Sequence, residues 1–263
     1  MTQEPLDGFP LWAIFLGVAT LTGIAWEVGY RLGVWRHARV VGEKESPVGA
    51  MVGAILGLLA FLLAFTFSMA ASRFDAKRLI VLDESNAIGT TYLRARLLPE
   101  PHRTTTGKLL REYVDARLPD WKKGDVNQAV AQMKTRSEEL HEQLWSEAVA
   151  AAEKQPTPIT ASFIQALNEM IDLHSKRVLI GTRNRIPMSI WVMLFSLAML
   201  GMAAIGYQSG LAATRRSPAM LGMVLAFAGV LLLIVDLDRG HEGLLTVSQQ
   251  SMIDLQKSMQ AAR

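Results

Sequence analysis

The residue types that could carry out chemistry are sparse in this sequence, and they form no recognisable catalytic motif. There is no Gly-rich phosphate loop, no paired-histidine zinc spacing and no nucleophile elbow. The chain has no cysteine, which excludes disulfides and thiolate metal sites. We see no reason to group its scattered histidines, which are His37, His102, His141, His174 and His241. We therefore expect a protein that is not an enzyme and has neither a cofactor nor a metal site.

Three acidic residues stand close to the ends of apolar stretches and could attract ions. Glu27 precedes Arg31 by one helical turn, so it is either a headgroup-level ion pair or an ion-attracting group at a pore mouth. Asp236 and Asp238 resemble part of a calcium loop with oxygen ligands, but too few ligands follow at regular spacing. The alternative is that both aspartates end a membrane helix beside Arg239.

The composition favours membrane helices as the elements that position these residues. Half of the residues are hydrophobic and only 7% are aromatic, and the formal charge of +3 is too small to indicate nucleic acid as a partner. Four apolar stretches are long enough to cross a bilayer, at 9–30, 47–71, 187–211 and 218–235. We predict an all-α polytopic membrane protein with four transmembrane helices and a helical extramembrane bundle between the second and third spans.

The second span continues into the longest predicted helix of the chain. No helix breaker occurs between Pro47 and Leu97, which indicates one helix of about 50 residues and about 75 Å. Small residues recur on one face at steps of three and four, and leucines continue the same face beyond a cluster of charges that begins at Arg73. The face comprises Gly49, Gly53, Gly57, Ala60, Ala64, Ser68, Ala71, Asp75, Leu79, Leu82, Asn86, Gly89, Leu93 and Leu97.

This face predicts close packing against another helix. Association in lipid depends on backbone proximity, so Gly49, Gly53 and Gly57 are expected to pack in a homo-oligomer, whereas in water the burial of leucine drives packing. Asn86 either sets the register of that packing or lines a hydrated vestibule. Asp75 either forms a charge ring in the oligomer or pairs at the surface with a nearby arginine.

A pore could be lined by the edge of the same face. Phe61 and Phe65 stand four residues apart, about one turn before Ser68, and rings of phenylalanine would form an apolar constriction that gates by dewetting. The alternative is that both rings pack against the third and fourth spans.

The remaining elements give the expected domain organisation. Soluble helices are predicted over 102–118, from Val126 to Glu153, and from a cap at Thr160 onward, and a last amphipathic helix carries residues from Leu245 to Met259. We expect transmembrane helices 1 and 2 at 9–71, the extramembrane bundle at 72–186, transmembrane helices 3 and 4 at 187–236 and the C-terminal helix at 237–263.

Four spans place residues 72–186 and both termini on one side of the bilayer. The short loops on the other side carry lysine and arginine that compete with the basic residues flanking the bundle, so the positive-inside rule does not decide the orientation. Glu4 and Asp7 precede the first span in place of a basic segment, which indicates a retained span and not a cleaved signal.

Four sequence blocks resemble the bacterial bestrophin-like domain family and occur in that family's order. They are AFTFSMAASRFDAKR, ESNAIGTTYLRARLLPEP, ALNEMIDLHSKRV and IVDLDRG, and the likeness covers nearly the whole chain. The family is distantly similar to the bestrophins, which are pentameric anion channels. The resemblance implies a bacterial inner-membrane location, cytoplasmic termini and bundle, and a pore lined by the second span. Where the family usually has proline after its Asp-x-Asp-Arg motif, this chain has Gly240 and His241.

Two functions remain open at this point. The first is an oligomeric ion channel, a pentamer by the resemblance, with the bilayer and inorganic ions as its partners. The second is a non-conducting, membrane-anchored helical scaffold or sensor, since no charged residue lies in the central turns of any span.

Overall fold

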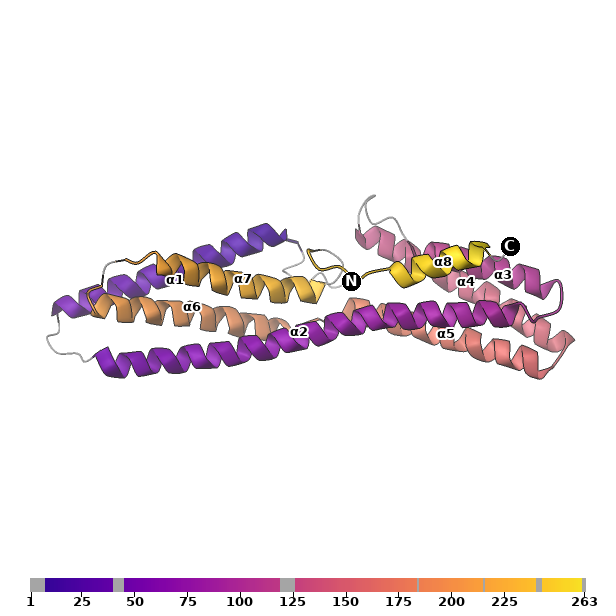
Figure 1. The fold of residues 1–263 in the computed structure, drawn as a ribbon, viewed down its shortest axis with the longest axis horizontal. Coiled ribbons are helices and arrows are strands. Elements are labelled where there is room, and N and C mark those ends of the chain that lie inside the picture. Colours follow the sequence, from indigo (N-terminus) through magenta and orange to yellow (C-terminus); the bar gives the residue numbers. More distant parts are fainter. Residues whose placement is uncertain are drawn as a thin grey trace. The chain divides into compact units, whose positions relative to one another are not determined.

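A computed structural model describes residues 8–39, 45–118, 126–183, 185–214, 216–239 and 243–261. Within these residues every regular element is an α-helix, as predicted (Figure 1). The helices are α1 (Leu11–Arg39), α2 (Glu45–Ala95), α3 (His102–Ala116), α4 (Val126–Lys154), α5 (Pro158–Arg183), α6 (Met188–Leu211), α7 (Ala219–Arg239) and α8 (Gln250–Ala261). Four of them, α1, α2, α6 and α7, are long and apolar enough to cross a membrane.

The chain divides into two compact units. The membrane unit contains Met1–Phe74 and Asn184–Thr246, and the extramembrane unit contains Asp75–Arg183 and Val247–Arg263. Helix α2 is a single element of 51 residues that contributes its first part to the membrane unit and its second part to the extramembrane unit. The C-terminal helix α8 belongs to the extramembrane unit, where it lies along α3 (Figure 1).

Helices α1 and α6 of the membrane unit approach each other more closely than side chains would allow. A Cβ atom at Gly29 would collide with the backbone of Ala203, and one at Gly206 would collide with the backbone carbonyl of Trp26. Gly33 and Gly210 make equally close backbone contacts one turn further along. Each helix therefore carries two glycines at a spacing of four, the arrangement that permits backbone-to-backbone packing in lipid.

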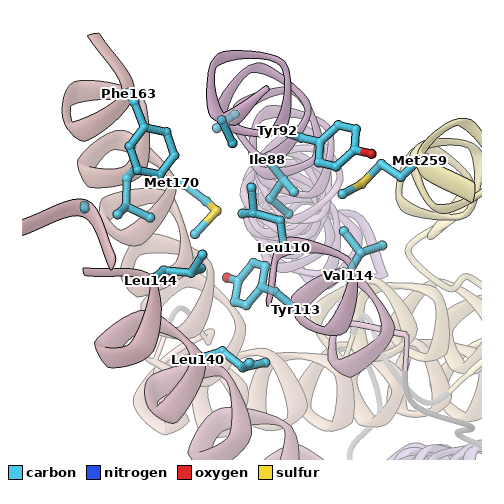
Figure 2. Packing of buried hydrophobic residues seen from close by; sticks show 14 of the residues in the cluster. Ile88, Tyr92, Leu110, Tyr113, Val114, Leu140, Leu144, Phe163, Met170 and Met259 are labelled. Carbon is cyan, nitrogen blue, oxygen red and sulfur yellow. The ribbon is translucent and has the colours of Figure 1, made fainter. Parts of the chain in front are cut away.

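The core of the extramembrane unit is built from large side chains of five helices. Figure 2 shows Ile88 and Tyr92 of α2 facing Leu110 and Val114 of α3, with α4, α5 and α8 closing the remaining sides. Other members of this core are Tyr113, Leu140, Leu144, Phe163, Met170, Met252 and Met259. The helical periodicity predicted for α3, α4 and α5 is confirmed by the burial of these residues.

Several predicted boundaries are wrong. Helix α1 continues through the basic segment to Arg39, because nothing in that segment interrupts helical hydrogen bonding. Helix α5 begins at Pro158, a residue tolerated in the first turn, and the cap is Thr157, whose hydroxyl accepts from the Thr160 backbone N–H at 3.3 Å.

At the C-terminal side, two boundaries differ as well. Helix α7 runs through both aspartates to Arg239, and α8 begins only at Gln250, after Leu245. Four features discussed above lie outside the described residues, namely Glu4, Asp7, the Gly240-His241 turn and the side chain of Val126.

Candidate functional site

In the membrane unit, the predicted face of α2 is left uncovered by the rest of the chain. Phe61 and Phe65 are 66% and 61% exposed, so neither ring is buried against the third and fourth spans of its own chain. Ser68 is exposed, and Cβ atoms added at Gly53 or Gly57 would meet nothing within 4 Å. Gly49 differs, because a Cβ there would lie 3.1 Å from the side-chain nitrogen of Gln208.

The opposite faces of the same helix segment are covered. Leu59, Leu63 and Ala70 are buried in a core that also contains residues of α1, α6 and α7. Four small residues of the predicted face, Gly53, Gly57, Ala60 and Ala64, are exposed and therefore do not serve packing within the chain. That role belongs to the glycines of α1 and α6, which the sequence analysis did not single out.

In the extramembrane unit the predicted face is also largely uncovered, except at Gly89, where a Cβ atom would lie 3.3 Å from the side chain of Leu255 in α8. Asp75 and Asn86 are exposed, and no ion pair of Asp75 is found among the described residues. Four leucines of the face are between 44% and 63% exposed, namely Leu79, Leu82, Leu93 and Leu97. Single exposed leucines are ordinary, but four in a row on one helix form an exposed apolar stripe.

Glu27 lies between two arginines within the membrane unit. Its carboxylate accepts hydrogen bonds from Arg31 at 2.8 Å and from Arg216 at 2.8 Å, and Arg216 also lies over the ring of Tyr30. These contacts join the second half of α1 to the segment after α6. The charge of Glu27 is consequently balanced within the chain.

Asp236 and Asp238 are buried and bind backbone groups. The carboxylate of Asp236 accepts from the N–H groups of Leu244 and Leu245, each at 3.0 Å. Asp238 accepts from the N–H of Ile186 at 3.0 Å. In this arrangement the two side chains hold the segments before α6 and after α7 against the end of α7, which satisfies buried backbone donors.

A buried group of charges in the extramembrane unit was not anticipated. Glu84 of α2 is fully buried and accepts from Nη2 of Arg117 at 3.1 Å, from Arg177 and from the hydroxyl of Tyr113 at 3.2 Å. The Tyr113 hydroxyl also lies 3.2 Å from Nδ1 of His174. Together with His141, these residues are called the Glu84 cluster below.

Two histidines that lie far apart in the sequence meet in this cluster. The rings of His141 and His174 stand edge to face with centroids 4.8 Å apart, and the ring of Tyr113 lies 5.0 Å from that of His141. His174 is buried and hydrogen-bonded, which confirms its interpretation as a core residue. The expectation that the histidines form no group is wrong for this pair, because the packing of α4 against α5 brings them together.

Burial and neighbouring charges shift the titration of several groups in the cluster. Burial, with the nearby His174 and Arg117, lowers the pKa of His141 to about 4. Burial and the Glu84 carboxylate raise the pKa of Tyr113 well above its ordinary value. Burial also lowers the pKa of Arg177, although Glu84 opposes that effect. His141 and Tyr113 are therefore neutral near pH 7.

Comparison with known proteins places the whole architecture in one family. The family model described as the bestrophin-like domain matches residues 20–252, which include α2 to α7, most of α1 and the start of α8. The chain belongs to the bestrophin-like family. No curated protein sequence matches it.

Solved structures similar to this bestrophin-like chain are bacterial bestrophin homologues from Klebsiella pneumoniae. A point mutant of that protein has a TM-score of 0.66 at 13% sequence identity, and the alignment covers 95% of this chain and 99% of the other. A second crystal structure of the homologue, phased with zinc, has a TM-score of 0.63 at 13% identity, and the alignment covers 96% of this chain and 98% of the other. At this identity the likeness establishes a shared fold.

One sequence signal could have revealed the Glu84 cluster in this bestrophin-like chain. Glu84 lies three residues after Val81 and four residues before Ile88, and both of these are buried. A buried carboxylate needs a hydrogen-bonding or charged partner, so the place of Glu84 on an apolar helix face predicts that such a partner is present. The sequence alone does not say that the partners come from the end of α3 and from α5.

Proposed function

We propose that this bestrophin-like protein is an oligomeric ion channel of the bacterial inner membrane, with its pore lined by helix α2. The observation that carries the proposal is the uncovered face of α2, which bears small residues in the membrane unit and leucines in the extramembrane unit. The role is non-enzymatic. Inorganic ions are its cargo, and the lipid bilayer is its surroundings.

Assembly from identical subunits follows from the residue types on this face. A second copy can approach the backbone at Gly53 and Gly57, because no other part of the chain occupies that space. The exposed leucines of α2 supply apolar area that is buried in water when copies associate. The family likeness favours five subunits.

The constriction in this proposal is formed by Phe61 and Phe65. Both rings are exposed and stand one helical turn apart, so copies arranged around an axis present two stacked apolar rings. Ser68 continues the lining toward the extramembrane unit, and Asp75 provides a ring of negative charge beyond it. Asn86 then faces a hydrated vestibule or a subunit contact.

Ion flux into liposomes tests this proposal. Replacing Phe61 and Phe65 together by alanine widens an apolar constriction, so flux should rise while native mass measurement shows the same oligomer. Phe67→Ala is the matched control, because it removes the same side chain about 200° further around the same helix and should leave flux unchanged. If the wild-type protein and the double Phe61→Ala/Phe65→Ala variant both show only the flux of empty liposomes while the oligomer is intact, the channel function is contradicted.

The second candidate function is a non-conducting scaffold or sensor anchored in the membrane. It is favoured by the state of the proposed ion-attracting groups, since Glu27 is paired with arginines and both aspartates of α7 hold backbone groups. The liposome experiment separates the two functions, because a scaffold assembles through α2 without conducting.

The orientation belongs to the same proposal. We place the extramembrane unit and both termini in the cytoplasm. Because the chain has no cysteine, single cysteines at Arg39 and Lys134 can be labelled separately in intact cells. We expect the cysteine at position 39 to be labelled from outside the cytoplasm and the cysteine at position 134 to be protected. The reverse pattern would invert the orientation.

A further inference from the structure

The Glu84 cluster carries more positive than negative charge. Arg117 and Arg177 are 1% and 11% exposed, and among the described residues Glu84 supplies the only carboxylate in contact with them. His141 and Tyr113 are neutral near pH 7, so neither supplies the missing negative charge. A buried arginine pair with a single carboxylate leaves at least one positive charge without a counter-charge, which is costly in the absence of water.

The unbalanced charge can be located on Arg117. Arg177 uses one nitrogen for Glu84 and donates from the other to the Gln249 side chain at 2.9 Å. Arg117 contacts Glu84 through Nη2 alone, and its Nε and Nη1 atoms are buried without a hydrogen-bond partner among the described residues. A guanidinium has five N–H donors, so the N–H groups at Nε and Nη1 await an acceptor.

Each of the two histidine rings in the same cluster also has a buried nitrogen atom without a hydrogen-bond partner among the described residues. Tyr113 has one O–H proton and donates it to Glu84, so Nδ1 of His174 must donate to the Tyr113 oxygen. The Nε2 atoms of His174 and His141 are buried and have no hydrogen-bond partner in the described part of the chain. His141 also lines an open surface hollow with Glu142, Trp145 and Ile171, so one edge of the cluster reaches the surface.

We propose that the Glu84 cluster holds a small monovalent anion of about chloride size against the unpaired N–H groups of Arg117, with the His141 edge beside it. The anion supplies both the missing negative charge and the missing acceptor. Glu84 keeps its place because it already accepts from three donors. The site lies within the extramembrane unit of a single chain, so it does not depend on conduction through α2.

The test compares chloride with gluconate, which is too large for a buried site, at constant ionic strength. The full-length protein in detergent should show a thermal midpoint that rises with the logarithm of chloride concentration. Bromide and nitrate should replace chloride. Arg117→Lys retains the charge beside Glu84 but removes the unpaired donors, so its midpoint should no longer respond.

Arg136→Lys is the matched control, because Arg136 lies at the surface, pairs with Glu112 and Glu139, and should retain the full chloride response. If chloride bound elsewhere in the chain, it would raise the thermal midpoints of Arg117→Lys and Arg136→Lys equally. Such a site would not account for a chloride response that only Arg117→Lys loses.

A second measurement remains available if Arg117→Lys does not fold. The pKa of His141 in the unaltered protein, followed by NMR of labelled histidine, should rise by about one pH unit or more in chloride, since an adjacent negative charge favours the imidazolium. The same pKa in chloride and gluconate would show that water fills the site and would overturn the proposal. An equal chloride response in wild type and Arg117→Lys would do so as well.

Discussion

In the membrane unit α1 and α6 pack backbone against backbone, whereas in the extramembrane unit α3, α4 and α5 pack through large side chains. Glycine pairs make the first contact possible, and a core that includes Tyr113, Leu144 and Phe163 makes the second. The contrast follows from the solvent. Lipid offers no hydrophobic drive for helix association, so close van der Waals contact must supply it, while water rewards the burial of large apolar groups.

The two units also handle charge differently. In the membrane unit Glu27 is balanced by arginines, and the buried Asp236 and Asp238 accept from backbone N–H groups. The extramembrane unit buries Glu84 with two arginines, one at the end of α3 and one within α5. Backbone N–H groups therefore bind the buried aspartates of the membrane unit, whereas side chains bind Glu84.

The largest predicted effect breaks the backbone packing of the membrane unit. Gly206→Leu places a side chain where the Trp26 carbonyl lies, so α1 and α6 must separate. We expect a loss of more than about 3 kcal/mol in stability, measured by thermal unfolding in detergent. Gly53→Leu is the comparison, because its side chain enters open space within the chain. It should remain folded yet dissociate on native mass measurement, and equal unfolding of both variants would refute the distinction.

The next prediction removes the central charge of the extramembrane unit. Glu84→Ala leaves Arg117 and Arg177 buried without a carboxylate, and we expect a destabilisation of about 3–5 kcal/mol in chemical denaturation. Glu139→Ala removes an exposed partner of Arg136 and should cost less than about 1 kcal/mol. A cost for Glu84→Ala as small as that of the control would mean that the buried pairs contribute nothing to the fold.

The smallest effect concerns pH and applies to the extramembrane unit alone. The pKa of His141 is about 4 in the folded chain and about 6.5 when unfolded, so the unfolded state binds a proton first. The contribution of His141 to stability is complete above about pH 6.5 and falls by on the order of 3 kcal/mol as the pH drops to 4.

His141→Gln should flatten this pH dependence of the unfolding free energy. His37→Gln, at an exposed position of α1, should leave it unchanged. An unaltered slope in His141→Gln would assign the acid sensitivity to another group.

The sequence by itself determined the four spans, the all-helical class and the unbroken course of α2. The length of an apolar stretch and its helical periodicity are local properties of the sequence, so they can be recognised without knowing which helices pack together. The exposed face of α2 was also predictable, because the residue types change from small to leucine where the charges at Arg73 begin. Its roles in assembly and conduction remain predictions.

Only the tertiary structure decided which glycines pack within the chain and which charges are buried together. Gly29 and Gly206 are separated by most of the sequence, and the spacing of glycines in α2 gave an equally good pattern for close packing. The partners of Glu84 come from the end of α3 and from α5, at positions whose own neighbourhoods in the sequence look solvent-exposed. Such groupings depend on which helix faces meet, and helix periodicity identifies a face without identifying its partner.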